Sequence, residues 1–244
     1  MMTISDLRFC WQNEESPQGD ELDRLPGSGF ELVIPSLVVA DSTIAAVTGP
    51  SGCGKTTLLN LIAGILRPIS GTIVVDSCDV CHMSEALRRD FRLRQIGMVF
   101  QDFQLINYLS VVENVLLPCR LSRKSTITAE QRTRATDLLA SVGLADKSKR
   151  PVTRLSQGER QRVAICRALI RQPSLILADE PTGNLDPVNS RQILELLIRQ
   201  ARAVDATLLM VTHDHGQLDV FDRRIEMEQF FVGSQAASGE QCPC

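Results

Sequence analysis

The order of apolar and polar positions divides the chain into a strand-rich first third and a longer part in which helices and strands alternate. Short runs rich in Val and Ile, bounded by Gly, Pro and Asp, lie at residues 30–34, 43–48 and 72–75. This pattern is typical of β-strands. Residues 55–66 place Leu and Ile at helical spacing, and Arg67-Pro68 is expected to end that helix. The first third is therefore predicted to be mostly β, with a strand, a glycine-rich loop and a helix in succession.

The second half of the chain has a different pattern. Residues 111–145 show helical periodicity without strand-like alternation, which predicts a helical subdomain. The elements expected after it are a helix at 157–171, a strand at 175–178, a helix at 189–204 and a strand at 207–212. Strands that alternate with helices imply a parallel sheet that is covered on both faces.

One domain is expected over residues 1–244, because no internal repeat appears and this length suits a large domain with a subdomain. Its core is expected at about 1–100 and 157–232, and the helical subdomain at about 101–156. Two polar stretches, at 12–29 and 233–244, are predicted to be a loop and a flexible tail.

Composition excludes two classes of function. The net charge of −3 shows no basic excess, so a nucleic-acid-binding surface is not expected. The longest apolar stretches, such as 175–178, fall far short of the run of about 18 residues that spans a bilayer. The first nine residues lack the apolar core of a secretory signal. We therefore expect a cytoplasmic chain without a membrane span of its own.

The eight cysteines are expected to be free thiols, because a cytoplasmic chain of this size needs no disulfides. Cys78 and Cys81 form a C-x-x-C pair, which could be half of a metal site or a redox pair. A second pair at zinc-site spacing is missing, since one residue separates Cys242 from Cys244. Metal binding is the less favoured interpretation.

The segment Gly49-Pro-Ser-Gly-Cys-Gly-Lys55-Thr56 carries the most specific chemistry. It follows a predicted strand and opens a predicted helix, which is the context of a phosphate-binding (Walker A) loop. Its backbone N–H groups would converge on phosphate oxygens at a helix N-terminus. Lys55 would reach the β and γ phosphates, and the Thr56 hydroxyl would ligate Mg²⁺. A glycine-rich turn with a surface lysine is the structural alternative, which the context disfavours.

Two acids, Asp179 and Glu180, end the apolar run 175–178. The carboxyl ends of buried parallel strands face the crevice in which such sheets bind ligands. Asp179 is expected to hold the Mg²⁺ shell and Glu180 to polarise the attacking water, since phosphoryl transfer depends on positioning and charge stabilisation. An acidic strand end without a catalytic role is the alternative.

A second short motif, Leu155-Ser-Gln-Gly-Glu159, precedes the helix predicted at 157–171. Ser156 and Glu159 fit a capping box, so helix capping alone can explain these two residues. It does not explain Gly158, because glycine inside a helix costs about 0.5–1 kcal/mol relative to Ala. A helix N-terminus that carries a glycine allows a phosphate to approach closely.

The phosphate-binding loop, LSQGE followed by ERQRVAICRAL, and the acid-ended strand together resemble the ABC (ATP-binding cassette) ATPase family over about residues 5–228. The resemblance implies an α/β fold of the P-loop NTPase type. Such a fold has a RecA-like core with a mixed or parallel sheet, an amino-terminal antiparallel β subdomain and an α-helical subdomain. It also implies ATP and Mg²⁺ as cofactors and hydrolysis of ATP to ADP and phosphate.

Four residues acquire roles only through this resemblance. Gln101 matches a glutamine at the subdomain junction that contacts Mg²⁺ and water, and it would otherwise be a surface residue. His213 matches the switch histidine that touches the γ phosphate, whereas a lone histidine at a strand end is usually a surface residue. Asp186 matches the loop that crosses to the other protomer, although it also suits a helix N-cap before a proline. Trp11 lies where the family keeps an aromatic ring that stacks on adenine.

The expected site therefore has three groups of residues. The catalytic residues are Glu180, His213 and Gln101. The metal-binding residues are Thr56, Gln101 and Asp179. The nucleotide-binding residues are Trp11, Gly49, Pro50, Ser51, Gly52, Cys53, Gly54, Lys55, Thr56, Thr57, Ser156, Gln157, Gly158, Glu159 and Asp186. Departures from the family pattern are Gln157 in place of Gly, Asp41-Ser42 in place of a Gly turn, and the length of 12–29. None of them removes a catalytic group.

The segment VFQDFQLINYLSVVENVLLP, with PTGNLD, is similar to the ATPases of lipoprotein-release, macrolide-efflux and cell-division complexes, which transmit force to a partner. This implies a homodimer that sandwiches two ATP molecules and separate transmembrane permease subunits, one of which docks a helix near Gln101 and 107–114. It also implies a position on the cytoplasmic face of the inner membrane, and it allows a periplasmic adaptor. Two alternatives remain: an ABC ATPase of DNA repair or translation usually brings a coiled coil or a second cassette, and a small-molecule kinase has no reason to carry LSQGE.

Overall fold

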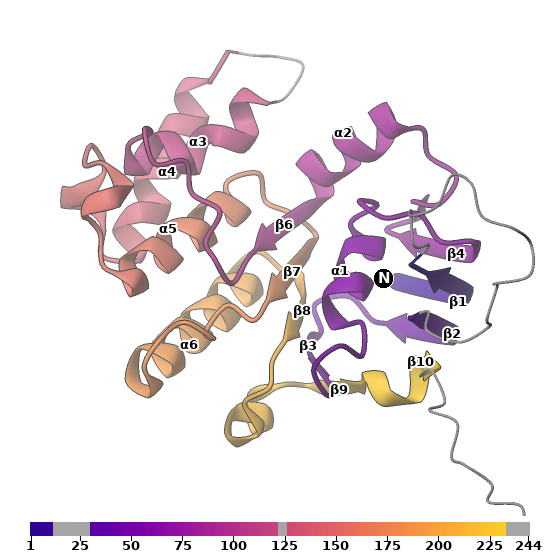
Figure 1. The fold of residues 1–244 in the computed structure, drawn as a ribbon. Coiled ribbons are helices and arrows are strands. Elements are labelled where there is room, and N and C mark those ends of the chain that lie inside the picture. Colours follow the sequence, from indigo (N-terminus) through magenta and orange to yellow (C-terminus); the bar gives the residue numbers. More distant parts are fainter. Residues whose placement is uncertain (12–29, 122–125, 233–244) are drawn as a thin grey trace, which may run out of the picture.

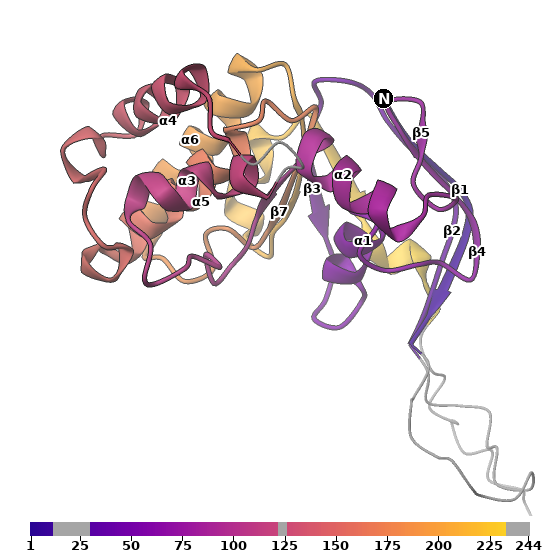
Figure 2. The ribbon, with the colours of Figure 1, turned by 90° about the horizontal axis from the view of Figure 1, so that it is seen from above.

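The computed structural model of the protein describes residues 1–11, 30–121 and 126–232. The loop predicted at 12–29 and the tail predicted at 233–244 lie outside these residues. Within them, two five-stranded sheets stand beside each other (Figure 1). Helix α1 lies between the sheets, and a group of helices covers the far face of the second sheet (Figure 2).

The first sheet is antiparallel and has the strand order β10-β2-β1-β4-β5. Its strands are β1 (Met2–Cys10), β2 (Glu31–Val39), β4 (Ser70–Val75), β5 (Cys78–Asp79) and β10 (Phe231–Val232). In β1 the buried side chains switch from even to odd positions after Asp6, whose φ of 49° breaks the alternation. The pairing with β4 shifts at the same place, between Ser5 and Arg8, so the strand bulges there.

The second sheet is parallel throughout and has the order β6-β7-β8-β3-β9. Its strands are β3 (Ile44–Thr48), β6 (Ile96–Val99), β7 (Leu175–Asp179), β8 (Thr207–Val211) and β9 (Arg223–Glu226). Strands β3 and β8 are buried at every position, as expected for a sheet covered on both faces. Successive residues of β8 enter different cores: Leu208 belongs to the core on the helical side and Leu209 to the core around α1.

The helices divide between these two cores. Helices α1 (Lys55–Ile62) and α2 (Glu85–Gln95) contribute to the core that the antiparallel sheet closes. On the other face of the parallel sheet lie α3 (Val111–Arg120), α4 (Ala129–Ser141), α5 (Gln157–Leu169) and α6 (Pro187–Ala203). Short 3₁₀ turns occur at Ala145–Lys147, Val152–Arg154, His215–Val220 and Met227–Phe230.

The predicted strands are confirmed as β2, β3, β4, β7 and β8, and the predicted helices after residue 110 are confirmed as α3 to α6. The helix predicted at 55–66 ends early, at Ile62. Gly64 has a φ of 62° there, and a Cβ on it would lie 2.7 Å from Val80. Helix α2 was not predicted, because it is mostly charged and buries only Arg88 and Phe91. No range was predicted for β1, β5, β6, β9 or β10, of which β5 and β10 have two residues each and β6 has four.

Three observations concern the described residues alone. None of their helices is long and apolar enough to cross a bilayer. The six cysteines among them are free, and no three of their His, Cys, Asp or Glu side chains gather into a group that could hold a metal ion. Cys242 and Cys244 lie outside this part of the chain.

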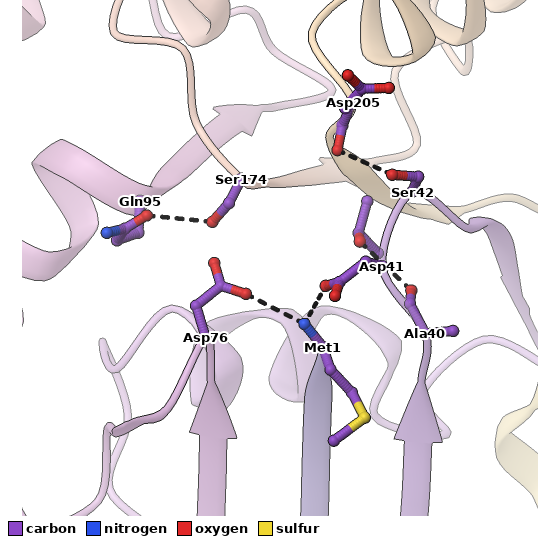
Figure 3. Close-up of polar contacts among 9 residues, drawn as sticks. Met1, Ala40, Asp41, Ser42, Asp76, Gln95, Ser174 and Asp205 are labelled. Carbon is purple, nitrogen blue, oxygen red and sulfur yellow. Dashed lines mark hydrogen bonds and ion pairs between the residues drawn. The ribbon is translucent and has the colours of Figure 1, made fainter.

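The turn Asp41–Ser42, which joins β2 of the first sheet to β3 of the second, makes contacts on both sides (Figure 3). The Met1 amine contacts the carboxylates of Asp41 and Asp76, which follow the strands on either side of β1. Ser42 takes a φ of 55°, and its Oγ donates to the carbonyl oxygen of Asp205 over 3.1 Å. The Ser42–Asp205 bond lies at the amino edge of the parallel sheet. Sheets of this kind bind ligands at the opposite edge, where the strands have their carboxyl ends.

Candidate functional site

The glycine-rich loop joins β3 to α1 at the carboxyl edge of the parallel sheet. Gly54 has a φ of 95°, and a Cβ on it would lie 2.5 Å from the ring of Phe30, so glycine is required. The Lys55 side chain is buried, and its Nζ donates to the carbonyl oxygens of Gly49 and Pro50, each over 2.8 Å. The cation therefore lies inside the loop at the start of a helix, where an anion is favoured.

Thr56 and Asp179 bring two oxygen ligands together from distant parts of the chain. The Thr56 Oγ1 donates to Asp179 Oδ1 over 3.2 Å. The pKa of the Asp179 carboxyl is raised, mainly because the group is buried and also because of the nearby charge of Glu180. The hydrogen bond from Thr56 and the charge of Lys55 lower this pKa but do not cancel the rise. A divalent cation at this place would stabilise the carboxylate, and oxygen ligands of these two kinds suit Mg²⁺.

Glu180 and His213 stand at the ends of neighbouring strands. Glu180 has a φ of 43°, a strained conformation for a residue with a side chain and one that is common at functional sites. Its N–H donates to the carbonyl oxygen of Val211 over 3.2 Å, which fixes it against the end of β8. Its Oε2 lies 3.3 Å from Nδ1 of the exposed His213. The fold thus places an acid and an imidazole side by side.

A cavity of about 760 Å³ opens between the glycine-rich loop and these strand ends. Its lining residues are Thr48, Gly49, Pro50, Ser51, Lys55, Glu180, His213, Leu218, Arg224, Glu226 and Glu228. The loop amides, the buried ammonium and the acid–imidazole pair therefore face one space.

Trp11 borders a second hollow, of about 340 Å³, that shares loop residues with the first. It is 50% exposed, and its ring stands at 88° to that of Phe9 with the centroids 5.3 Å apart. Thr56 and Thr57 line the same hollow. The ring is thus available to a planar group beside the phosphate loop.

Gln101 is exposed in the segment that leads from β6 to α3. Its carbonyl oxygen accepts a hydrogen bond from Nδ2 of Asn184 over 3.2 Å. Its side-chain amide lies beside Gly183, where a Cβ would be 3.1 Å from Nε2. The N–H of Gly183 donates to the carbonyl oxygen of Glu180 over 3.1 Å. Gln101 therefore lies against the loop that follows Glu180.

The motif at 156–159 forms the N-terminus of α5, and its predicted capping box is confirmed. Ser156 Oγ accepts from the Glu159 N–H, and Glu159 Oε2 accepts from the Ser156 N–H over 2.9 Å. A Cβ on Gly158 would approach no atom closer than 3.6 Å, so its own chain does not require glycine there. In the described part of the chain, neither hollow around the phosphate loop is lined by a residue of this motif.

Asp186 is the exposed N-cap of α6, as its alternative interpretation predicted. Its Oδ1 accepts from the N–H groups of Val188 and Asn189 over 3.2 and 3.1 Å. Capping uses this one oxygen for both bonds, and the side chain remains at the surface.

Sequence reasoning did not identify the backbone contacts of three polar residues: Asn114, Arg167 and Asn184. Asn114 was placed on the expected docking surface at 107–114, but it is fully buried. Its amide bonds to the backbone of Ile106 and of the two residues that precede α3. Because a side chain that holds its own loop is unavailable to a partner, Asn114 does not belong to that surface. A polar residue inside an apolar helical pattern was the signal that could have identified it.

The comparisons with known proteins agree with this geometry. The sequence pattern of the family described as "ABC transporter" matches residues 34–183, and the chain belongs to this family. It is an ABC-type ATPase with the P-loop NTPase fold and the ATP-binding subunit of an ABC transporter.

Among its relatives are lipoprotein-releasing system ATP-binding proteins, LolD. LolD 1 of Caulobacter vibrioides is 43% identical over 191 residues, which cover 78% of this chain and 81% of the relative. LolD 1 of Rhodopirellula baltica is 40% identical over 227 residues, 93% of each chain. The dimeric cassette MJ0796, solved in a post-hydrolysis state bound to ADP and Pi, has a TM-score of 0.77 at 30% identity and covers 93% of this chain and 94% of its own.

Proposed function

We propose that two copies of the chain bind two ATP molecules head to tail between them, and that hydrolysis drives separate transmembrane subunits. The observation that carries this proposal is the place of the 156–159 motif at an exposed helix N-terminus: among the described residues, it lines neither of the two hollows beside its own phosphate loop. Gly158 supports it, because the glycine leaves room that its own chain does not use. The dimers of MJ0796 are a precedent for pairing of such cassettes.

In this proposal each phosphate loop, from Gly49 to Thr57, grips the ATP phosphates of its own site, and Trp11 stacks on the base. The hydrogen bonds from Lys55 Nζ to the carbonyl oxygens of Gly49 and Pro50 hold the ammonium group inside the loop. When ATP binds, this ammonium group would contact the β and γ phosphates. The partner's Ser156, Gln157, Gly158, Glu159 and Asp186 would complete the site across the interface.

Mg²⁺ would be held by Thr56 and Asp179, whose oxygens already converge, together with Gln101. When bound, it would neutralise charge on the transferred phosphoryl group. Glu180 would orient the attacking water, and His213, 3.3 Å from it, would contact the γ phosphate. The strained backbone of Glu180 keeps its carboxylate at the cavity.

The finer assignment is an export or force-transmitting transporter for lipoprotein, lipid, peptide or drug, supported by the likeness to LolD proteins. A periplasmic adaptor would join such a complex. We place the chain on the cytoplasmic face of the inner membrane, as one domain with a core at 1–100 and 157–232, a helical subdomain at 101–156 and a tail at 233–244.

A helix from a transmembrane subunit would dock in an apolar groove of about 340 Å³ beside Gln104. The groove is lined by Met98, Phe100, Leu117, Pro118 and Leu121, with Arg92, Arg167 and Arg171 among its other residues. Arg92 and Arg171 beside an apolar floor favour a helix that carries apolar and acidic side chains. The buried Arg167 already donates to the carbonyl oxygens of Phe103 and Gln104. Tyr108, 87% exposed in the neighbouring segment, would extend this surface.

Replacement of Lys55 tests the nucleotide site. Lys55→Ala should lose ATP binding and hydrolysis, because the ammonium is the central charge of the loop. Lys149→Ala, at an exposed lysine away from the cavity, is the matched control and should behave as wild type. Calorimetric ATP titration and phosphate release measure both proteins. Wild-type hydrolysis by Lys55→Ala would overturn the site assignment.

A further inference from the structure

The segment 101–104, which begins with Gln101, has a strained backbone. Its last two residues, Phe103 and Gln104, have φ values of 58° and 50°. For residues with a side chain this left-handed conformation costs roughly 1–2 kcal/mol each. Two consecutive residues of this kind persist only where surrounding contacts hold them, so the contacts of this segment identify what fixes it.

Arg167 on α5 provides one of these contacts. Its Nη2 donates to the carbonyl oxygen of Phe103 over 2.7 Å, and its Nη1 donates to that of Gln104. The side chain is buried, and burial lowers its pKa to about 10. In the described part of the chain no ion pair includes it. The buried charge therefore serves the two carbonyl groups of this segment and not a carboxylate.

Asn184 binds the residues at the start of the same segment. Its Nδ2 donates to the Gln101 carbonyl oxygen and to Asp102 Oδ1, both over 3.2 Å. Asn184 is exposed and stands in the loop that connects Glu180 to the Asp186 cap. The hydrogen bond that anchors Gln101 runs through its carbonyl oxygen, so the place of its side chain depends on where the backbone is held.

We propose that Arg167 and Asn184 are positioning residues that hold Gln101 in register with the reacting phosphate, a role that rests on the proposed function of Gln101. Arg167 sits on the same helix as Ser156, about 16 Å along its axis at 1.5 Å per residue, and Asn184 lies two residues before Asp186. Arg167 and Asn184 are therefore each connected along the chain to a residue, Ser156 or Asp186, that would contact the partner protomer. Through these connections, the position of Gln101 would depend on formation of the ATP-bound dimer.

Two substitutions of different severity test the arginine. Arg167→Met keeps the apolar stem and removes both donors, and Arg167→Lys keeps the charge but replaces the two-pronged donor with one head group. Arg134→Met is the matched control. Arg134 also donates to two backbone carbonyls, those of Leu169 and Ile170, but they belong to the end of α5 and not to the Gln101 segment.

Asn184→Ala removes the second anchor at the surface, where unfolding is not expected. Its control is Gln200→Ala, which removes another side-chain amide, that of the half-buried Gln200, bonded over 3.2 Å to Ser141. The double variant Arg167→Met with Asn184→Ala tests whether both residues act on one segment. If they do, the combined loss is smaller than the product of the two single losses.

The full-length chain is assayed for ATP affinity by calorimetry, for kcat and KM by phosphate release, and for hydrogen exchange of amides 102–110 by mass spectrometry. We expect kcat to fall about 10- to 100-fold in Arg167→Met and less in Asn184→Ala and Arg167→Lys. ATP affinity and KM should stay within about twofold, since the phosphate loop is unchanged. Exchange at 102–110 should accelerate, whereas Arg134→Met and Gln200→Ala should match wild type in both measurements.

A wild-type kcat in Arg167→Met, or an equal loss of kcat in Arg134→Met, would overturn the proposal. A loss of ATP affinity in Arg167→Met without a loss of kcat would also overturn the proposal, because Arg167 would then act on folding or ATP binding and not on the reaction. Gln101→Ala and Glu180→Gln are run beside them. If those two keep full hydrolysis, the proposed function of the site fails; if they lose it while Arg167→Met does not, the positioning role alone fails.

Discussion

Two helix N-termini, those of α1 and α5, belong to the proposed nucleotide site, and they are capped in different ways. Helix α1 starts after Gly54, with no side chain that caps its first N–H groups. Helix α5 starts after Ser156, with a complete capping box. The first N–H groups of α1 have no side-chain cap and are open to a ligand, whereas at α5 the capping box binds the N–H groups of Ser156 and Glu159 and does not include those of Gln157 and Gly158. We therefore expect the first to hold a phosphate by itself and the second to add a contact to a nucleotide that is held elsewhere.

The largest effect that tests the difference between α1 and α5 is expected on ATP-dependent dimerisation. Glu180→Gln should bind ATP but hydrolyse it about 100-fold more slowly or worse, because the carboxylate that orients water is gone. With ATP and Mg²⁺ it should accumulate as a dimer. Adding Ser156→Arg should leave ATP binding to the monomer nearly unchanged and abolish the dimer, since a bulky cation would occupy the place of the partner's γ phosphate. Size-exclusion chromatography with light scattering measures both outcomes.

Thr128→Arg is the matched control for Ser156→Arg. Thr128 is the N-cap of another capping box, at α4, so its replacement removes a cap of the same kind far from the motif. This variant should still dimerise in the Glu180→Gln background. Dimerisation of the Ser156→Arg protein, or its loss in both variants, would contradict a specific role of the α5 N-terminus.

Glycine replacement gives an effect of intermediate size. Gly54→Ala should lower the free energy of unfolding by about 2 kcal/mol or more, from its positive φ and the close Phe30 ring. Gly158→Ala should raise it by about 0.5 kcal/mol, because its own chain leaves room for a methyl group. Urea denaturation without nucleotide checks both signs.

Two further observations complete this test. Gly143→Ala, which has a positive φ but no atom within 4 Å, isolates the strain from the clash at Gly54. Gly158→Ala should be more stable than wild type and yet hydrolyse ATP more slowly, since the methyl group would obstruct the partner's phosphate. A stabilised variant with full activity would remove Gly158 from the proposed site.

The smallest effect is expected at Glu159. Its pKa is lowered by the hydrogen bond from Lys147 and then by the Ser156 N–H, so its folded-state pKa lies below its unfolded value. The stabilisation is therefore present above the unfolded pKa of about 4.3 and is lost as pH falls through the folded pKa. Glu159→Gln should lower the free energy of unfolding by about 0.5 kcal/mol at pH 7. Urea midpoints at several pH values should converge in acid; a constant difference would show that the charge is not responsible.

Much of the site was readable from the sequence because its parts are local. The phosphate loop, the acids after β7 and the capping box of α5 each occupy a few consecutive residues, and their chemistry follows from spacing and from the end of a strand or helix. The burial of successive β8 residues in two cores likewise follows from the apolar run Leu208–Val211. Local propensity and periodicity decide such features before any tertiary contact forms.

Only the tertiary structure decided the rest. Arg167 is 63 and 64 residues from the carbonyl groups it binds, and Asn184 is 83 from Gln101, so no periodicity connects them. Helix α2 was not predicted because its sequence is mostly charged and it buries only two side chains. Helix α1 ends earlier than predicted because Gly64 has a positive φ and packs closely against Val80. The sequence by itself determined the local chemistry and the elements that carry it. The fold decided which distant backbone groups are bonded, because those bonds depend on how the elements pack and not on the order of residues within any one of them.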